Sequence, residues 1–420
     1  MFTSFVFFGN LNSVLGNGSS LLSSYVLELG QSLFLGKLYC RNKNFEKIYD
    51  EKILRIDDFG VLTALKEGNT KVAFQNKISN TKTTINISVI PKKNIRFFLV
   101  DNEEYDVISR LNVYVTTPCD TNITKIKLLL DKVNKNEFIT DKKFEDSGVF
   151  VWNVYLDNLP ENEYRMKIFV LKDDLWVESG IYGLRAVKNS DRFFAPKDIS
   201  AGGVRFIMGH EGFSSRIYFD IVDVATIGYG KVIYPGEVFY NEIPRIEAFI
   251  LLKDHVNKFV SRKINDFLMK NNIICTQNQF DALVSFSYNV GTNWINSDVK
   301  IINTILDTKK INTDFKKVNV ETFLNVREKA STDSNVILKL HNNEIVRVVD
   351  IFENWTKIEK DGIIGFCSNK FLVPLYNLGN INIEEFSKWF LSYHHAGNKC
   401  VLGLLMRRTK ELDIFYKCKY

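Results

Sequence analysis

The stretch EGFSSRIYFDIVDVATIGYG, from Glu211 to Gly230, carries most of what this sequence says about fold and chemistry. It places Glu211, Asp220 and Thr226 with eight and then five residues between them, around a short turn bounded by β-forming residues. Two carboxylates held across a cleft are the minimum equipment for cleaving a glycosidic bond. One must stay protonated in an apolar setting, and the other must stay ionised to steer water or stabilise the transition state. Because 49 of the 420 residues are acidic, this spacing has to be judged with its surroundings.

The surroundings consist of three ordered blocks of residues. The first is Glu211-Gly212-Phe213, Tyr218-Phe219-Asp220 and Thr226-Ile227-Gly228-Tyr229-Gly230. The second runs from Gln277 to Leu283 and on to Tyr288-Asn289-Val290-Gly291. The third comprises Phe386, Trp389, Ala396-Gly397, Gly403-Leu404, Arg407-Arg408 and Glu411. Together they resemble the phage-type lysozymes of glycoside hydrolase family 24.

The resemblance implies an α+β phage-lysozyme fold and assigns roles to individual residues. Glu211 is expected to be the general acid, and Asp220 and Thr226 are expected to position the attacking water of an inverting glycosidase. Tyr229, Tyr288, Asn289, Arg407 and Arg408 are expected to bind substrate, although a structural role for the two arginines is an equal alternative. The sequence departs from the family pattern at Lys231, where many relatives carry His.

A helix is predicted immediately before the first block. Asp198 or Ser200 can serve as its N-cap, ahead of the apolar residues from Val204 to Ile207. We expect this helix to end at Glu211, where Gly212 breaks it. His210 is expected to be half-buried or at the surface, since the family pattern gives it no catalytic role.

Length and composition limit the remaining possibilities. A chain of 420 residues is too long to fold around a single hydrophobic core, so its length predicts two to four domains. The net charge of +6 suits an anionic wall polymer, and no dense basic stripe indicates nucleic acid. The six cysteines lack metal-ligand spacing, so no metal or cofactor is expected and the thiols are read as buried or idle. No apolar run predicts a membrane span, and the N-terminus makes a poor secretory signal.

The N-terminal half is predicted to be all-β. Short alternating strands over residues 25–92, with the run from Ile56 to Gly68, resemble the bacterial immunoglobulin-like domain of group 2. Residues 93–190 have the strand spacing of a second sandwich of immunoglobulin or fibronectin type. Residues 1–24 are expected to dock on a partner or to be disordered. Without paired acids or a metal cluster, residues 1–190 are expected to be a separable attachment and spacer region.

A small β-barrel is predicted between the second and third blocks. Residues 318–375 contain Leu324-Asn325-Val326-Arg327, Trp355 and Gly365-Phe366, and they resemble the bacterial Src-homology-3-type barrels of wall hydrolases. The lysozyme domain is therefore expected to be discontinuous, over residues 196–316 and 378–420. Trp389, Leu402, Leu404 and Leu405 are expected to pack into its helical lobe.

These readings favour a muramidase that cleaves the β-1,4 bond between N-acetylmuramic acid and N-acetylglucosamine in peptidoglycan. A lytic transglycosylase is the competing enzyme, and a non-catalytic wall-binding protein of a phage particle is the competing structural function. The expected setting is synthesis in the host cytoplasm followed by assembly into the virion tail, with tail proteins as partners of residues 1–190. A free endolysin is the alternative.

Overall fold

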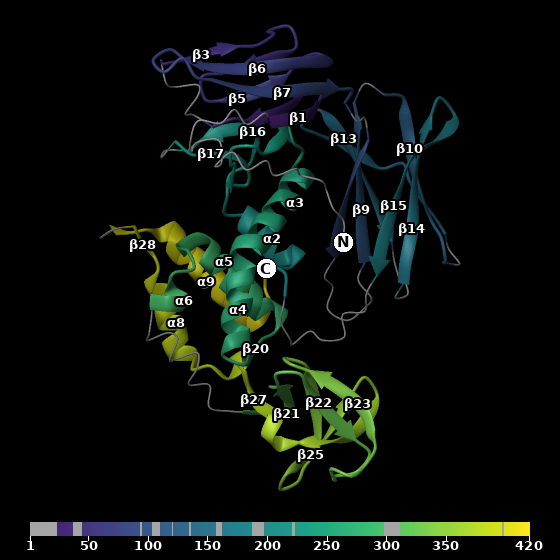
Figure 1. Cartoon of the computed structure of the whole chain (residues 1–420), viewed down its shortest axis with the longest axis vertical. Helices are drawn as coiled ribbons and strands as arrows, with labels where there is room; N and C mark the ends of the chain where they lie inside the picture. The colour runs from purple at the N-terminus through teal and green to yellow at the C-terminus, as the bar shows by residue number, and fades with distance from the viewer. Residues whose placement is uncertain are drawn as a thin grey trace. The chain divides into compact units, whose positions relative to one another are not determined.

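The structure is a computed structural model, and it describes residues 23–36, 44–92, 95–102, 110–119, 121–133, 136–156, 162–186, 197–220, 223–297, 311–396 and 399–420. All but the last two residues of the predicted docking segment 1–24 lie outside these ranges. The chain divides into two compact units. Unit 1 comprises Met1–Lys188 and Glu211–Leu252, and unit 2 comprises Asn189–His210 and Lys253–Tyr420. Figure 1 follows the chain through both.

The first sandwich of unit 1 consists of two sheets around one apolar core. One sheet has the order β1-β7-β6-β3 and the other β19-β2-β5-β4. Leu27, Leu33, Leu62 and Phe74 are among the residues buried between them. Its N-terminal strands are β1 Ser23–Glu28, β2 Gln31–Phe34, β3 Phe45–Ile48, β4 Leu54–Ile56, β5 Val61–Ala64, β6 Gly68–Asn76 and β7 Lys82–Ile90.

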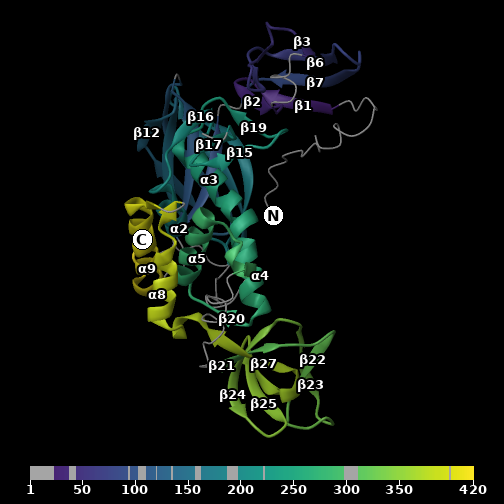
Figure 2. The same cartoon turned by 90° about the vertical axis from the view of Figure 1, so that its left-hand side faces the viewer.

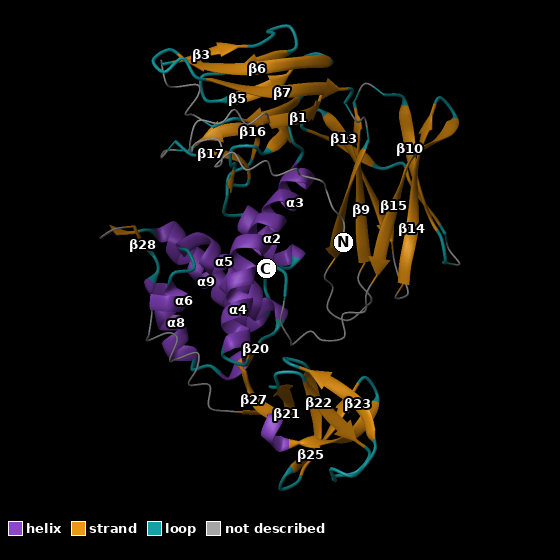
Figure 3. Ribbon diagram, viewed as in Figure 1, coloured by secondary structure: helices purple, strands orange, loops and turns teal. Residues whose placement is uncertain are grey.

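The second sandwich follows with sheets of order β11-β10-β14-β15 and β12-β13-β9-β8. Its core includes the fully buried Trp152, whose indole N–H donates to the Thr117 hydroxyl over 2.9 Å. Figure 3 shows that both sandwiches are built from strands. The strands are β8 Arg96–Asn102, β9 Arg110–Pro118, β10 Ile123–Leu130, β11 Glu137–Thr140, β12 Lys143–Asp146, β13 Val149–Leu156, β14 Asn162–Lys172 and β15 Leu175–Ala186. The expected all-β character of this half is confirmed.

The segment 211–252 completes unit 1, and its fold differs from the expected separation of enzyme and sandwiches. Its elements are β16 Ser214–Phe219, β17 Ala225–Gly228, β18 Lys231–Val232, β19 Val238–Tyr240 and the first part of α3 Arg245–Val256. The strands β16, β17 and β18 form a small sheet. β19 instead pairs antiparallel with β2 of the first sandwich, as Figure 2 shows. A three-residue strand carries too little periodicity to reveal such a partner in the sequence.

Unit 2 contains the helices and the barrel. Ser200 caps α2 Ala201–Met208 by accepting from the Gly203 amide, as one of the two expected caps. The helix ends at Met208 and not at Glu211, because Gly209 is a poor helix former. The central helix α5 Gln277–Val290 has a Thr276–Gln279 capping box and ends at Gly291. The other elements before the barrel are the π-helical turn η2 Asn257–Ser261, α4 Arg262–Lys270, β20 Ile273–Ile274 and α6 Trp294–Ser297.

After the barrel come η4 Leu378–Asn380, α8 Ile383–Ser392, β28 His395–Ala396, β29 Lys399–Cys400 and α9 Leu402–Lys417. Trp389 is buried as expected, packing against Phe286 and Trp294. The expectation for Leu402 is wrong, since its side chain is 69% exposed. The buried face of α9 is formed instead by Arg407, Arg408, Glu411, Ile414 and Phe415.

The barrel belongs to an eight-stranded sheet among the described residues, which β20 also joins. Its strands are β21 Ile311–Val318, β22 Phe323–Arg327, β23 Val336–His341, β24 Ile345–Ile351, β25 Trp355–Lys360, β26 Ile363–Ser368 and β27 Leu372–Asn377, with the turn η3 Asn369–Phe371. The entering strand β21 pairs antiparallel with the leaving strand β27, so the chain enters and leaves the barrel side by side. Such close ends suit the predicted insertion. No helix among the described residues is both long and apolar enough to cross a membrane.

Candidate active site

The three predicted catalytic residues lie in the part of unit 1 from residue 211 to 252, which we call the site segment. Glu211 and Asp220 are partly exposed, whereas Thr226 is 4% exposed. Tyr218 lies directly opposite Thr226 in the antiparallel pair of β16 and β17. Opposite residues of such a pair direct their side chains to the same face of the sheet. The sheet therefore presents Tyr218 and Thr226 on one face, with Asp220 just beyond the end of β16.

The pKa of Tyr218 responds to both predicted catalytic carboxylates. Burial raises the pKa of Tyr218, and the negative charges of Glu211 and Asp220 raise this pKa further. Coulomb effects of this kind weaken quickly with distance and screening, so Glu211 and Asp220 are both close enough to act on the Tyr218 phenol. The sequence reading did not name Tyr218 as a site residue. Its place two positions before Asp220 was the signal that pointed to it.

The turn after Asp220 fixes the direction of its carboxylate. Oδ1 of Asp220 accepts the Val224 amide over 2.8 Å, and the Asp220 amide donates to the Val224 carbonyl over 3.1 Å. The Thr226 hydroxyl donates to the same Val224 carbonyl over 3.1 Å. A hydroxyl that donates one hydrogen bond can still accept another, for example from water. Val224 thus links the carboxylate and the hydroxyl that are expected to hold the attacking water.

Two further residues of the site segment have structural partners. The ring of Tyr229, one of the predicted substrate-binding residues, is 6% exposed and lies 5.2 Å from that of Phe213. Burial raises the pKa of Tyr229, against the charge of Arg245, whose guanidinium also lies over Phe213. Lys231, which departs from the family pattern, is buried and forms an ion pair with Glu237. Lys231 therefore supports the turn that leads into β19.

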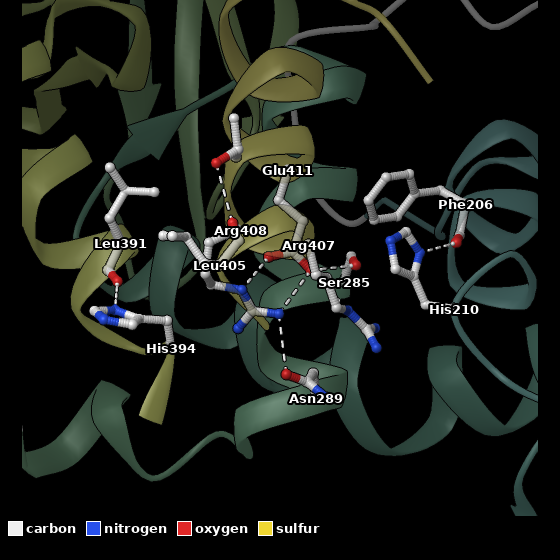
Figure 4. Close-up of polar contacts among 11 residues, drawn as sticks. Phe206, His210, Ser285, Asn289, Leu391, His394, Leu405, Arg407, Arg408 and Glu411 are labelled. Carbon is white, nitrogen blue, oxygen red and sulfur yellow. Dashed lines mark hydrogen bonds and ion pairs between the residues drawn. The ribbon is translucent and has the colours of Figure 1, made fainter. Parts of the chain in front are cut away.

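The other predicted substrate-binding residues belong to unit 2. Tyr288 is partly buried and Asn289 is exposed, at the end of α5. Figure 4 shows Arg407 and Arg408 around Glu411, with Arg408 also donating to Asn289 over 3.0 Å. Arg407 and Arg408 are 4% and 0% exposed, so direct contact of either arginine with a wall polymer does not fit the structure. Their charges compensate the buried carboxylate of Glu411, which favours the structural role that was the alternative to substrate binding.

The Glu411 cluster is held by several contacts inside the helical core. Oε1 of Glu411 also accepts from the Ser285 hydroxyl over 2.7 Å. Burial raises the pKa of Glu411, against the effect of both arginines, and burial lowers the pKa of Arg408 to about 10. His210, also drawn in Figure 4, has its Nδ1 at 2.9 Å from the Phe206 carbonyl. Among the described residues, no three His, Cys, Asp or Glu side chains gather into a group that could hold a metal ion.

Comparison with known families identifies two domains in the chain. Residues 208–321 match the phage lysozyme family and residues 322–373 match the bacterial SH3 domain. The chain thus carries a phage lysozyme domain that includes Glu211, Asp220 and Thr226, followed by a bacterial SH3 domain. Neither match extends to residues 1–207 or 374–420, so the immunoglobulin-like resemblance and the second lysozyme part stay predictions.

Individual relatives are similar over limited stretches. The chain is 38% identical over 105 residues to an endolysin of Bacillus phage B103, which is 24% of this chain and 37% of that protein. It is 40% identical over 96 residues to an endolysin of Bacillus phage PZA, which is 22% of this chain and 35% of that protein. The matched part thus spans little more than a third of either relative. A solved endolysin from Escherichia coli O157:H7 phage FAHEc1 matches with 20% identity and a TM-score of 0.32, covering 54% of this chain and 99% of that one.

Proposed function

We propose that the chain is a muramidase that hydrolyses the β-1,4 bond between N-acetylmuramic acid and N-acetylglucosamine in peptidoglycan. The observation that carries the proposal is the match of residues 208–321 to the phage lysozymes, in which Asp220 and Thr226 both hydrogen-bond with Val224 and Glu211 lies in the same segment. Two carboxylates around one position, with a hydroxyl on the same sheet face, are the equipment of a glycoside hydrolase.

The proposed reaction is an inverting hydrolysis. Glu211 donates its proton to the glycosidic oxygen as the bond to the anomeric carbon breaks. Asp220 and Thr226 hold a water on the opposite side of the sugar, and Asp220 accepts a proton from that water as it attacks. The products are a free alcohol and a hemiacetal of inverted configuration. Proton exchange with solvent then restores Glu211 and Asp220 to their starting forms.

Replacing the acid tests this proposal. Glu211→Gln keeps the shape of the side chain and removes the donor, so lysis of purified walls should fall by about a hundredfold or more. Asp220→Asn should be similarly severe, whereas Thr226→Ala should cost about tenfold or less, because water can replace one hydroxyl. Glu242→Gln is the matched control, since this carboxylate of the same segment forms an ion pair with Arg216. Full lysis by a folded Glu211→Gln variant would refute the role of Glu211 as general acid, whereas a wild-type chain that binds walls without lysing them would leave only the wall-binding structural function.

Product analysis distinguishes the enzyme classes. Nuclear magnetic resonance of fresh products should show the inverted anomer. A retained anomer would contradict the water-positioning role of Asp220, and anhydro-sugar ends would identify a lytic transglycosylase instead.

We further propose that the enzyme acts from the phage particle, with peptidoglycan and tail proteins as its partners. Support comes from the two sandwiches that precede the lysozyme domain, because they can carry contacts to tail proteins in addition to those with the site segment. The two curated relatives carry the name endolysin, which favours the alternative of release at host lysis. Mass spectrometry of purified particles decides between them, since a virion protein remains with particles after washing in high salt and an endolysin does not. We also propose that the barrel binds the cell wall, as is common among the bacterial Src-homology-3-type barrels that residues 318–375 resemble.

A further inference from the structure

The site segment shares its framework with both N-terminal sandwiches. In the first sandwich, β19 extends the sheet of β2, with Val238 opposite Leu33 and Tyr240 opposite Gln31. The Val238 side chain packs on the core of that sandwich. The hydroxyl of Ser32 donates to Oδ1 of Asn241 over 2.9 Å, and the hydroxyl of Tyr240 donates to Glu28. β19 therefore lies within the lysozyme match in the sequence but is a strand of the first sandwich in the structure.

A second contact reaches the residue next to Asp220. Phe219 lies opposite Ala225, so its side chain points to the face of β16 away from Tyr218 and Thr226. On that face the ring of Phe59 stacks on Phe219 with 4.7 Å between centroids and 25° between planes. Phe34 of β2 approaches the same ring at 6.3 Å. The aromatic contact therefore holds the backbone immediately before the carboxylate that is proposed to position water.

The turn that carries Phe59 is itself rigid. Oδ1 of Asp57 accepts the amides of Phe59 and Val61, each over 2.9 Å. Gly60 has a φ of +87°, and a Cβ there would lie 2.4 Å from the Gly36 carbonyl oxygen. The Leu35 amide also donates to the Gly60 carbonyl over 2.8 Å. Because this turn is fixed to the first sandwich, the Phe59 ring holds Phe219 in a defined position relative to that sandwich.

The second sandwich contacts the site segment at the start of α3. The buried carboxylate of Asp146 accepts the backbone amide of Arg245 over 2.5 Å and its guanidinium over 3.1 Å. Arg96 forms an ion pair of 2.5 Å with Glu247. The next residue of α3, Ala248, packs against Gly228, whose φ of +65° and missing Cβ permit the close approach. Gly228 ends β17, the strand that contains Thr226.

We propose that the two sandwiches are positioning elements of the site segment, and that Phe59 is a positioning residue that acts on Asp220 through Phe219. This inference rests on the proposed muramidase function. It replaces the expectation of a separable spacer, because residues 23–186 contact β16, β19 and α3 of the site segment.

The test uses the full chain with three substitutions. Phe59→Ala removes the stacked ring, Phe59→Tyr retains it, and Ile78→Ala is the control, since Ile78 is 77% exposed on another turn of the same sandwich. On soluble wall fragments, Phe59→Ala should lower kcat by about tenfold or more, with KM changed by less than about twofold, because a displaced catalytic group slows the reaction. Phe59→Tyr and Ile78→Ala should keep the wild-type kcat. A rise in KM at constant kcat would overturn the proposal, since it would make Phe59 a sugar-binding residue.

Hydrogen exchange gives a readout that is independent of activity. The Val224 amide donates to Asp220, so its exchange rate reports whether this carboxylate is held in place. Phe59→Ala should speed exchange at Val224 by about tenfold, and the other two variants should leave it unchanged. Unchanged exchange at Val224 in Phe59→Ala would refute the positioning role. If exchange responds but neither the wild type nor any variant cleaves walls, the proposed function fails and the positioning role stands.

Discussion

At the scale of single residues, Glu411 shows how charge can be buried in a helical core. Its side chain is 0% exposed and is compensated by Arg407, Arg408 and Ser285. Removing one member of such a cluster leaves the opposite charges buried without compensation. We expect Glu411→Gln to lower the free energy of unfolding by about 3–5 kcal/mol, measured by urea denaturation.

The control for this prediction lies on the same helix. Asp413 pairs with Lys417 near the surface, where the two side chains are 38% and 61% exposed. Asp413→Asn should therefore cost less than about 1 kcal/mol. Equal losses in the two variants would show that the buried cluster contributes no more than a surface pair.

A second buried carboxyl predicts a dependence of stability on pH. Burial raises the pKa of Glu247, with Arg96 and Lys92 opposing the shift. A carboxyl with a raised folded pKa stabilises the fold fully below its unfolded pKa of about 4.3, and this contribution is lost as the pH rises through the folded pKa. The free energy of unfolding should therefore fall less steeply from pH 4.3 upward in Glu247→Gln than in the wild type. Parallel urea midpoints for the two proteins across this range would contradict the prediction.

At the scale of secondary-structure elements, α3 begins against a carboxylate from a distant strand. Asp146 ends β12 and accepts the first amide of α3, one of the amides that have no partner within a helix. Asp146→Ala should cost about 1–2 kcal/mol, as loss of a helix cap does. Glu145→Ala is the matched control, because the neighbouring Glu145 is exposed, and it should change stability by less than about 0.5 kcal/mol. Urea midpoints provide the comparison.

The elements also show which features could be predicted from the sequence. Ser200 and the Thr276–Gln279 box are local capping signals, so the starts of α2 and α5 were predictable. The pairing of β19 with β2 depends on partners far apart in the chain and leaves no local pattern. The inward face of α9 was mispredicted at Leu402, because Arg407, Arg408 and Glu411 take buried places that apolar residues usually fill. The motif predicts Glu211, Asp220 and Thr226 as site residues, but it could not reveal that Phe59 stacks on Phe219, the residue before Asp220.

At the scale of the whole molecule, the contacts of the site segment predict what a truncation will do. A chain of residues 197–420 keeps Glu211, Asp220 and Thr226 but lacks β2, Phe59, Arg96 and Asp146. We expect it to lyse purified walls at least about a hundredfold more slowly than the full chain, because the site segment loses the framework that orients it. Adding the separately produced fragment 1–190 serves as a rescue arm. Full activity of the truncated chain by itself would restore the picture of a separable spacer.

The pairing of β19 with β2 also sets an order of events during synthesis. Residues of β2 leave the ribosome about 200 residues before their partner strand exists. At roughly 5–20 residues per second, β2 waits about 10–40 s with an unpaired edge. Such an edge can recruit strands of other chains, so slow or interrupted translation should favour aggregation of nascent chains. Completion of the first sandwich and of the site segment is then a single late step, so the proposed activity can begin only after more than half of the chain has been made.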